Sequence, residues 1–408
     1  MKVFSTTEHQ TFSQEEIEQI KEVKLDFSCG EGQVKFLGLD PNMRTSYFVG
    51  IDWLQVNETA IQVNPKIKSL DYISMFMDCL NGPHLNKYLD KIYHIDLDNP
   101  QIETDSVPFD ITPMLIIHFL GVVRNLARKG LKRDYIRVEE NLQSKVKGKI
   151  KFSNHFKSNI SKGRFDKNYC NYQEYSVDCL ENQILKKTLL FAGSFINKCK
   201  LSHKTQTIYN FCMSAFDGVS DDINATMIKR IRINPVFKEY AEALKLAKLI
   251  LKRFAYSISE TTRQDKRKTP PFWIDMSLLF ELYVLGKLKD AYGNQIQYQV
   301  SGKYGSVDFT KKDEKIVMDT KYKMIYNNSK YDIDNIRQVS AYARDINIRK
   351  KLNAHIDELL SCCIIYPNFD KQEDFADRSL LDEKIDQFEK FWKIGIKLPT
   401  IEAEKSIT

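Results

Sequence analysis

The chain lacks the signatures of several common protein classes. It has no G-x-x-x-x-G-K-[ST] motif, so we do not expect it to hydrolyse a nucleotide through a P-loop. Its 8 cysteines include no Cys-x-x-Cys pair, and its 7 histidines are scattered, so no zinc site of ordinary ligand spacing is expected. No internal repeat is visible along the 408 residues.

Long hydrophobic runs are also missing. The longest, Met114 to Val123, includes His118 and is too short to span a bilayer, so it predicts a buried helix and no membrane partner. The N-terminus carries no secretory signal, and we therefore expect the protein in a reducing cytoplasm. There, Cys362 and Cys363 are expected to pack as small apolar side chains in a buried strand.

The bulk composition is that of a globular protein. Hydrophobic residues make up 42% of the chain and charged residues 28%, and the length suffices for two or three domains. Lys and Arg number 61 against 54 Asp and Glu, which gives a net charge of +7. A modest positive charge permits a nucleic-acid partner without requiring one.

The most informative residues are two acids near the ends of two predicted strands. Gln297–Phe309 and Ile316–Tyr322 have strand character, and a polar turn separates them. In such a hairpin Asp308 and Asp319 can converge. Two adjacent carboxylates repel each other and lose solvation, and Mg²⁺ or Mn²⁺ removes both penalties. Lys321, on the same face as Asp319, can orient a water or stabilise charge on a phosphate.

The Asp-x-Lys spacing is weak evidence alone, because other acid-x-Lys triplets occur in this charged chain. They are Glu22-Val23-Lys24, Asp313-Glu314-Lys315 and Asp382-Glu383-Lys384. The triplet Asp319-Thr320-Lys321 differs from these because it closes an apolar strand. A triplet in a polar turn, such as the one at Asp313, is better explained as a solvated charge cluster.

The flanking segments support a catalytic interpretation. A predicted helix over 274–292 carries Glu281 among apolar residues, where a carboxylate needs a partner or a metal. A second helix, 332–347, places Gln338 and Tyr342 at i, i+4 on one face. Simpler roles remain open: Glu281 could pair with Lys287 or Lys289, and Gln338 could cap a sheet edge.

These residues, together with several phrases further upstream, resemble the PD-(D/E)XK nuclease superfamily and, more narrowly, the McrC family of nuclease subunits of McrBC-type (5-methylcytosine) restriction systems. The phrases that carry the narrower resemblance lie within 109–367, and they are 135–142, 146–150, 172–175, 181–186, 280–281 and 318–323. The sequence departs from the superfamily pattern where Val307, and not proline, precedes the first acid.

The resemblance implies a C-terminal αβββαβ core and a metal-dependent endodeoxyribonuclease. Asp308, Asp319 and the carbonyl of Thr320 would bind Mg²⁺ or Mn²⁺, with Lys321, Glu281 and Gln338 as further catalytic residues. It also implies a partner, a hexameric AAA+ GTPase of McrB type, whose GTPase this chain stimulates and without which it is not expected to cut DNA. Because one site cuts one strand, a double-strand break requires a second copy or a second encounter.

A multidomain α+β or α/β organisation follows. We expect a β-rich domain at 1–108, which the resemblance assigns to partner binding, and a mixed domain at 109–256. A linker at 257–271 then leads to the nuclease domain, 272–408. The middle domain contains two predicted strands, 134–142 and 147–152. Because side chains alternate along a strand, basic residues gather on one face, which is either solvated or faces DNA: Lys145, Lys147, Lys149 and Lys151. Tyr342 of the nuclease domain could also contact DNA.

Two other functions remain open. The chain could be an inert scaffold or activator of the NTPase that keeps a nuclease fold, although the complete set of Asp308, Asp319 and Lys321 argues against this. It could also be a stand-alone nuclease acting on RNA or on DNA repair intermediates, although the phrases of the middle region argue against that. A stable complex with an NTPase would separate the first proposal from the last.

Overall fold

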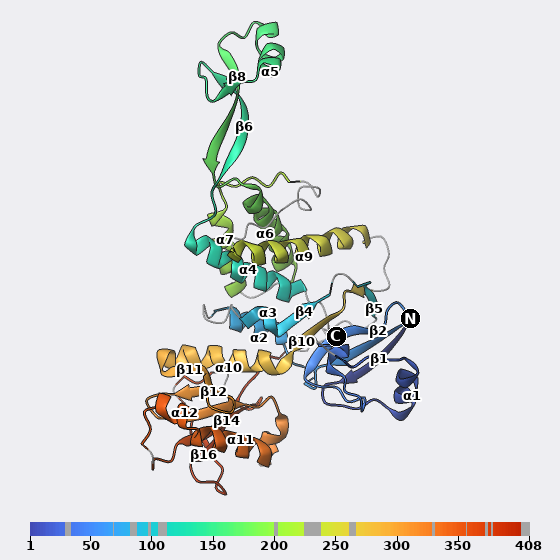
Figure 1. Ribbon diagram of the computed structural model, residues 1–408, viewed down its shortest axis with the longest axis vertical. Coiled ribbons are helices and arrows are strands. Elements are labelled where there is room, and N and C mark those ends of the chain that lie inside the picture. Colours follow the sequence, from blue (N-terminus) through green and yellow to red (C-terminus); the bar gives the residue numbers. More distant parts are fainter. Residues whose placement is uncertain are drawn as a thin grey trace, which may run out of the picture. The chain divides into compact units, whose positions relative to one another are not determined.

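The computed structural model describes residues 1–28, 34–67, 69–81, 88–96, 99–104, 112–199, 203–223, 238–260, 267–328, 331–355, 357–371, 374–376 and 378–400. It divides into two compact units with mixed helices and sheets, an α+β organisation (Figure 1). Unit 1 joins Met1–Met114 to Asp265–Thr408, and unit 2 is Leu115–Gln264. The segments predicted as an N-terminal domain and a nuclease domain therefore belong to one compact unit. None of the described helices is long and apolar enough to cross a membrane.

Five strands of unit 1 form a sheet that uses both ends of the chain. Across the sheet they are β1 (Lys2–Thr7), β3 (Thr59–Asn64), β2 (Phe48–Gln55), β10 (Phe272–Asp275) and β4 (Tyr93–Ile95). The β1–β3 pair is parallel and the others are antiparallel. β2 is apolar along most of its length, as a strand buried on both faces requires. Helices α1 (Gln14–Glu22), α2 (Tyr72–Asn81) and α3 (Leu89–Ile92) lie in the N-terminal segment of unit 1, Met1–Met114.

The predicted linker, 257–271, contains secondary structure at both ends, and this corrects the prediction. Helix α9 runs over Lys238–Glu260, and β9 (Arg267–Thr269) pairs with β5 (Ile102–Thr104). Residues 261–266 lie outside the described part of the chain. A short two-stranded pair needs little apolar surface, so the polar composition of this segment did not indicate β9. β10 then follows at once, with Phe272 and Ile274 buried.

A six-stranded sheet occupies the C-terminal part of unit 1. Its order is β11 (Ile296–Ser301), β12 (Ser306–Lys311), β13 (Ile316–Thr320), β14 (Ser361–Pro367), β16 (Phe391–Ile396) and β15 (Glu383–Lys384). β11, β12 and β13 pair antiparallel, whereas β13, β14 and β16 pair parallel. Helix α10 (Met276–Tyr292) precedes β11, and α11 (Ile333–Arg344) connects β13 to β14. The element order α10, β11, β12, β13, α11, β14 is the αβββαβ order expected from the resemblance.

The stretch 297–309, predicted as one strand, is two. A tight turn separates β11 from β12, and the Gly302 N–H donates to the Gly305 carbonyl at 2.7 Å. A side chain at Gly302 would collide with the Asp345 carboxylate, and Gly305 has a φ of +147°. Alternation of apolar and polar residues continues through the turn, so periodicity alone did not detect it.

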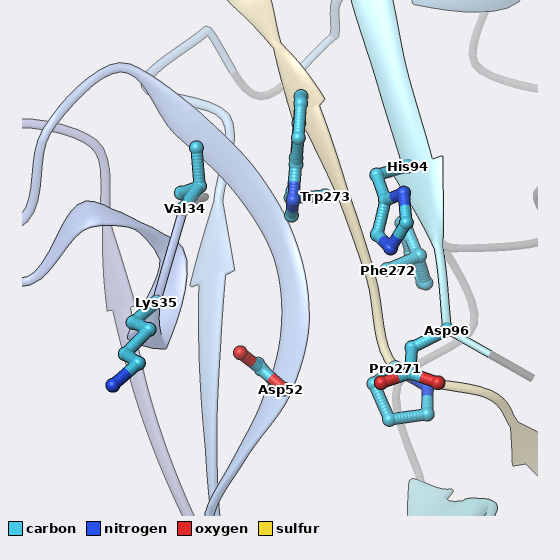
Figure 2. Close-up of a pocket in the computed structure, with 8 residues that line it drawn as sticks. All are labelled: Val34, Lys35, Asp52, His94, Asp96, Pro271, Phe272 and Trp273. Atoms are coloured by element: carbon cyan, nitrogen blue, oxygen red, sulfur yellow. The ribbon is translucent and has the colours of Figure 1, made fainter. Parts of the chain in front are cut away.

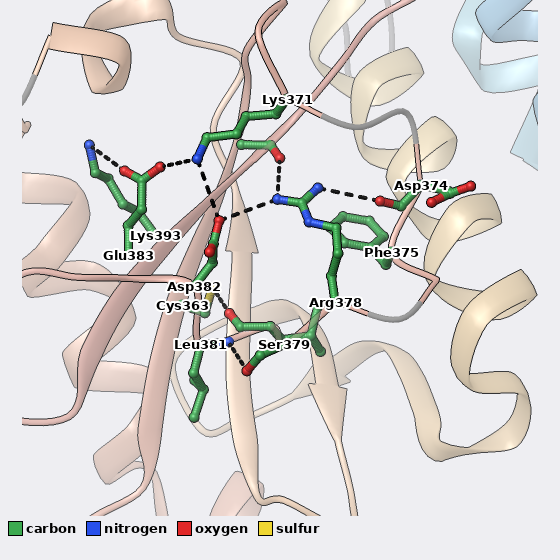
Figure 3. Close-up of polar contacts among 12 residues, drawn as sticks. Cys363, Lys371, Asp374, Phe375, Arg378, Ser379, Leu381, Asp382, Glu383 and Lys393 are labelled. Atoms are coloured by element: carbon green, nitrogen blue, oxygen red, sulfur yellow. Dashed lines mark hydrogen bonds and ion pairs between the residues drawn. The ribbon is translucent and has the colours of Figure 1, made fainter.

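Ion pairs hold the chain between β14 and β16 against the outer edge of this sheet (Figure 3). Glu383 accepts from Lys371 at 2.7 Å and pairs with Lys393 at 3.2 Å, while Arg378 pairs with Asp382 at 3.3 Å. Such partly exposed pairs contribute little stability each, but they share partners and fix one arrangement. Beneath them, Cys363 is buried and its thiol donates to the Leu380 carbonyl at 3.1 Å.

Unit 2 consists of helices and a three-stranded sheet. Its helices include α4 (Thr112–Lys129), α6 (Leu180–Cys199), α7 (His203–Ala215) and α9. α4 matches the predicted helix and ends before Gly130, which has a φ of +93°. The sheet order is β6 (Asp134–Gln143), β8 (Lys167–Ser176) and β7 (Lys149–Ile150). The long β6–β8 pair extends away from the helices of unit 2 and carries α5 (Phe152–Ser158) at its far end (Figure 1).

A cavity of about 320 Å³ opens on the five-stranded sheet (Figure 2). The rings of His94 and Trp273 stack on its wall with centroids 5.9 Å apart. Asp52 of β2 also lines it, and burial raises the pKa of Asp52 to about 6, although the backbone N–H groups of Trp53 and Phe36 donate to its carboxylate. None of the predicted catalytic residues lines this cavity.

We predict that Asp52→Asn becomes more stable relative to the wild type as the pH rises. In the folded protein the pKa of Asp52 is about 6, above the ordinary value of 3.8, so the folded state binds this proton more tightly than the unfolded state does. The wild type therefore loses stability between about pH 4 and about pH 6, and asparagine removes that loss. Melting temperatures measured across this range should diverge. Parallel curves for the two proteins would contradict the prediction.

Candidate active site

Asp308 and Asp319 face each other across two neighbouring strands. β12 and β13 pair antiparallel with Phe309 opposite Met318, so the preceding Asp308 and the following Asp319 are also opposite. Asp319 is 3% exposed, and the three residues that precede it in its strand, Ile316 to Met318, are buried and apolar. Burial of these apolar residues therefore offsets the cost of removing the Asp319 carboxylate from water.

Neighbouring donors hold both carboxylates. Oδ2 of Asp308 accepts from the backbone N–H of Thr320 at 2.7 Å and from its hydroxyl at 2.5 Å. Lys321 Nζ lies 2.5 Å from Asp319 Oδ2. Apart from this ion pair, that buried oxygen has no polar partner among the described residues.

The electrostatics of the pair favour a bound cation. Burial raises the pKa of Asp308 well above its ordinary value, and the charges of Asp319 and Glu281 raise it further. Burial also raises the pKa of Asp319, and Lys321 opposes that shift. Each carboxylate is therefore unstable as an anion in the presence of the others, which is the condition under which divalent metals bind carboxylate pairs.

Glu281 approaches the same acids from helix α10. Burial raises its pKa, and the charge of Asp319 adds to that effect, while hydrogen bonds from Gln299 and Tyr298 lower it. Gln299 Nε2 donates to Glu281 Oε1 at 2.5 Å. The simpler role suggested for Glu281 is wrong, because Lys287 pairs with Asp78 and Lys289 donates to the Ile296 carbonyl.

Gln299 is a site residue that sequence analysis missed. It lies in β11 between two pairs, Tyr298 with Phe309 and Val300 with Val307, and so sits across from Asp308. Its φ of +52° is in the left-handed region, which an L-residue adopts only at an energetic cost. The strained backbone accompanies the hydrogen bond to Glu281. Strand alternation contains no signal for it, because alternation assumes regular strand geometry.

Lys321 is held on its far side by α11. Lys321 Nζ donates to Gln338 Oε1 at 2.9 Å, and Gln338 Nε2 donates to the hydroxyl of Tyr342 at 3.1 Å. The i, i+4 spacing of Gln338 and Tyr342 thus makes the contact that the helix predicts. Gln338 does not cap a sheet edge as in the simpler interpretation; its amide connects the lysine to the tyrosine.

The donor set suits a hard divalent cation. The predicted ligands, Asp308, Asp319 and the Thr320 carbonyl, are all oxygen donors. Among the described residues no group of three or more His, Cys, Asp and Glu side chains could hold a metal ion, so the two acids would bind one only as an open set. Mg²⁺ fits such an open set, because it is usually held by one or two carboxylates and keeps several of its waters.

The predicted DNA-binding lysines lie in unit 2, and their geometry corrects the prediction. Only 149–150 of the predicted strand 147–152 is a strand, since α5 begins at Phe152. Lys147 pairs with Glu174 at 3.8 Å, and Lys151 pairs with Glu139 at 2.7 Å. The four lysines therefore do not share one face of a regular strand, and two of them are partly neutralised. Contact with DNA there remains a prediction.

The site brings Asp308, Asp319 and Lys321 together in a mixed α+β protein, and the comparisons with known proteins give the family. The family model of the McrBC 5-methylcytosine restriction system component matches residues 43–356. Since this is well over half of the chain, the protein belongs to that family.

Two solved structures from Thermococcus gammatolerans are similar to the chain. One is a half-complex of McrB AAA+ hexamers with bound McrC, at 16% identity, with 97% of this chain and 94% of that chain covered and a TM-score of 0.39. The other is the McrBC complex, also at 16% identity, with 70% and 87% covered and a TM-score of 0.33. No curated protein matches.

We predict that Asp308→Asn stabilises the metal-free protein by about 1 kcal/mol. An amide keeps an acceptor for Thr320, removes one of the mutually repelling buried charges and offers a donor toward Asp319. Thermal unfolding in EDTA measures the effect. The matched control is Asp313→Asn, in another Asp-x-Lys triplet. The Asp313 side chain is 43% exposed beside Lys311, and this substitution should change stability by less than about 0.5 kcal/mol. A destabilised Asp308→Asn protein would contradict the repulsion described here.

Proposed function

We propose that the protein is the metal-dependent endodeoxyribonuclease subunit of an McrBC-type restriction system and that its C-terminal sheet is a PD-(D/E)XK core. The observation that carries the proposal is the placement of Asp308 and Asp319 on facing strands, with Lys321 ion-paired to Asp319. The element order α10, β11, β12, β13, α11, β14 supports the same superfamily.

Each side chain has a role in phosphodiester hydrolysis. Asp308, Asp319 and the Thr320 carbonyl would hold Mg²⁺ or Mn²⁺, which when bound neutralises the acids and polarises the scissile phosphate. Lys321, whose ammonium is fixed between Asp319 and Gln338, orients the attacking water or stabilises the negative charge that develops on phosphorus. Tyr342 keeps the Gln338 amide in place. Glu281 adds a third carboxylate next to Asp308 and Asp319.

The turn between β11 and β12 is the part of unit 1 that we propose contacts DNA. It immediately precedes the strand that carries Asp308, and its Tyr304 is 87% exposed. Lys303 Nζ lies 5.3 Å from the Tyr304 ring, and its backbone N–H donates to Asp345 Oδ2 at 2.6 Å. A fixed turn with an exposed aromatic ring and an ammonium group suits a base or sugar together with a phosphate.

The proposed partner is a hexameric AAA+ GTPase of McrB type, which this chain would bind and stimulate. In the Thermococcus gammatolerans structure McrC is bound to McrB AAA+ hexamers. The family resemblance assigns this contact to residues 1–108. The β6–β8 hairpin is a further candidate, because its far end exposes Phe152 at 79% and Phe165 at 78%, and exposed apolar groups mark binding surfaces. Double-strand cleavage would need a second copy of the subunit or a second encounter with the DNA.

We predict that plasmid cleavage requires Mg²⁺, the GTPase and GTP, and that Asp319→Ala abolishes it. The expected loss is at least about 1000-fold, because the substitution removes a metal ligand and the partner of Lys321. Gel analysis of plasmid DNA measures it, with ATP in place of GTP as one control and Asp313→Ala as the matched control. The control variant should cut like the wild type.

Other outcomes would change the proposal. Cleavage by the isolated chain would retain the nuclease and remove the obligate partner. Equal cutting by the wild type and Asp319→Ala would place the active site elsewhere. If neither protein cuts while the GTPase rate of the partner rises, the chain is an activator with an inert nuclease fold.

A further inference from the structure

A buried ion pair lies at the end of two strands of the five-stranded sheet and contacts the chain just after β13, the strand that carries Asp319. Glu8 follows β1 and Lys66 follows β3, and these two strands are parallel neighbours, so both residues emerge at the same end. The Lys66 N–H donates to Glu8 Oε1 at 3.1 Å, and Lys66 Nζ lies 3.5 Å from Glu8 Oε2. The Glu8 side chain is fully buried, and that of Lys66 is 20% exposed.

The same ammonium contacts the residue directly after Lys321. Lys66 Nζ donates to the Tyr322 carbonyl at 2.6 Å and lies 3.7 Å from the centroid of the Tyr322 ring. That ring packs in turn on Phe280 of α10, the neighbour of Glu281, with centroids 5.6 Å apart. On the other side, the Lys321 N–H donates to the Ile365 carbonyl of β14 at 2.9 Å. The backbone on either side of the Lys321–Tyr322 peptide is thus fixed by two separate elements.

Stability alone does not account for this arrangement. Burial raises the pKa of Glu8 to about 7 and lowers that of Lys66, so each charge is costly in its place. Glu8 Oε2 has no hydrogen-bond partner among the described residues. Buried ion pairs of this kind are often no more stabilising than apolar residues of similar size. What apolar side chains could not do is donate a hydrogen bond to the Tyr322 carbonyl.

We propose that Lys66, oriented by Glu8, is a positioning residue for Lys321. By fixing the Tyr322 carbonyl it fixes the direction in which the chain leaves β13, and with it the place of the Lys321 ammonium between Asp319 and Gln338. The inference rests on the proposed nuclease function. It makes the N-terminal sheet a working part of the active site, through a contact between residues 256 positions apart in sequence.

The test measures kcat for DNA cleavage by the full chain with its GTPase at saturating Mg²⁺. Lys66→Met should lower kcat about 10- to 100-fold, as the loss of a supporting residue around a metal site does, and Lys66→Arg should restore most of it. In a Lys321→Ala background the same Lys66→Met change should lower kcat no further, since it acts through the missing lysine. Mn²⁺ affinity, measured by calorimetry, should stay close to that of the wild type, because Lys66 contacts the Tyr322 carbonyl and none of the proposed metal ligands.

The chain offers a matched control in Lys287→Met. Lys287 is 19% exposed, pairs with Asp78 of α2 at 3.0 Å and lies 5.2 Å from the Tyr283 ring centroid. It therefore has a carboxylate and an aromatic partner like those of Lys66, and it too connects the N-terminal segment to the C-terminal one. Lys287→Met should leave kcat unchanged. If it lowers kcat as much as Lys66→Met does, the effect is general loosening and the inference fails.

Glu8→Gln keeps the test decisive if Lys66→Met does not fold. It retains the size of the side chain, removes the anion that orients Lys66, and should lower kcat in the wild type but not in the Lys321→Ala background. Unchanged kcat, or equal losses in both backgrounds, overturns the positioning role while the nuclease stands. A wild type that neither cuts DNA nor binds Mn²⁺ overturns the proposed function itself, and the inference with it.

Discussion

The repulsion between two desolvated carboxylates is the constraint around which this site is built. Antiparallel pairing of β12 and β13 puts Asp308 opposite Asp319, and burial raises the pKa of both. Each neighbouring contact offsets part of that cost, through the donors of Thr320 and the ammonium of Lys321. None of them removes it entirely. The proposed divalent cation would offset the remainder, and meanwhile the fold supplies the energy that keeps the acids together.

The two sheets of unit 1 share that task. β10 belongs to the N-terminal sheet, and its last residue, Asp275, is also the N-cap of α10, where its carboxylate accepts from the Leu278 N–H. The helix that carries Glu281 is thus anchored in one sheet while its side chain faces the acids of the other. The contact of Lys66 with Tyr322 joins the same two sheets at a second point. A fragment that begins at residue 272 would keep β10 but lose the strands that β10 pairs with, and it would also lose Lys66.

Sequence reasoning reached the parts of the site that depend on local pattern. The apolar strand before Asp319 and the i, i+4 spacing of Gln338 and Tyr342 are visible in a short window, and the structure brings these residues together. Contacts made over long separations could not be predicted. Lys66 has no local feature that points to Tyr322, and Gln299 takes a positive φ that strand periodicity does not encode. Likewise the sequence places β10 with the nuclease domain, because its partner strands β2 and β4 lie far upstream in the chain.

The position of β10 also sets the order in which the sheet can be completed during synthesis. β2 pairs with β3 on one side and with β10 on the other, and β10 begins at Phe272, after the whole of unit 2. While the chain grows on the ribosome, β2 has one open edge until unit 2 has emerged. An open apolar edge is a template for pairing with another chain. The same strand that anchors α10 thus leaves β2 with an unpaired edge for the time it takes to translate unit 2.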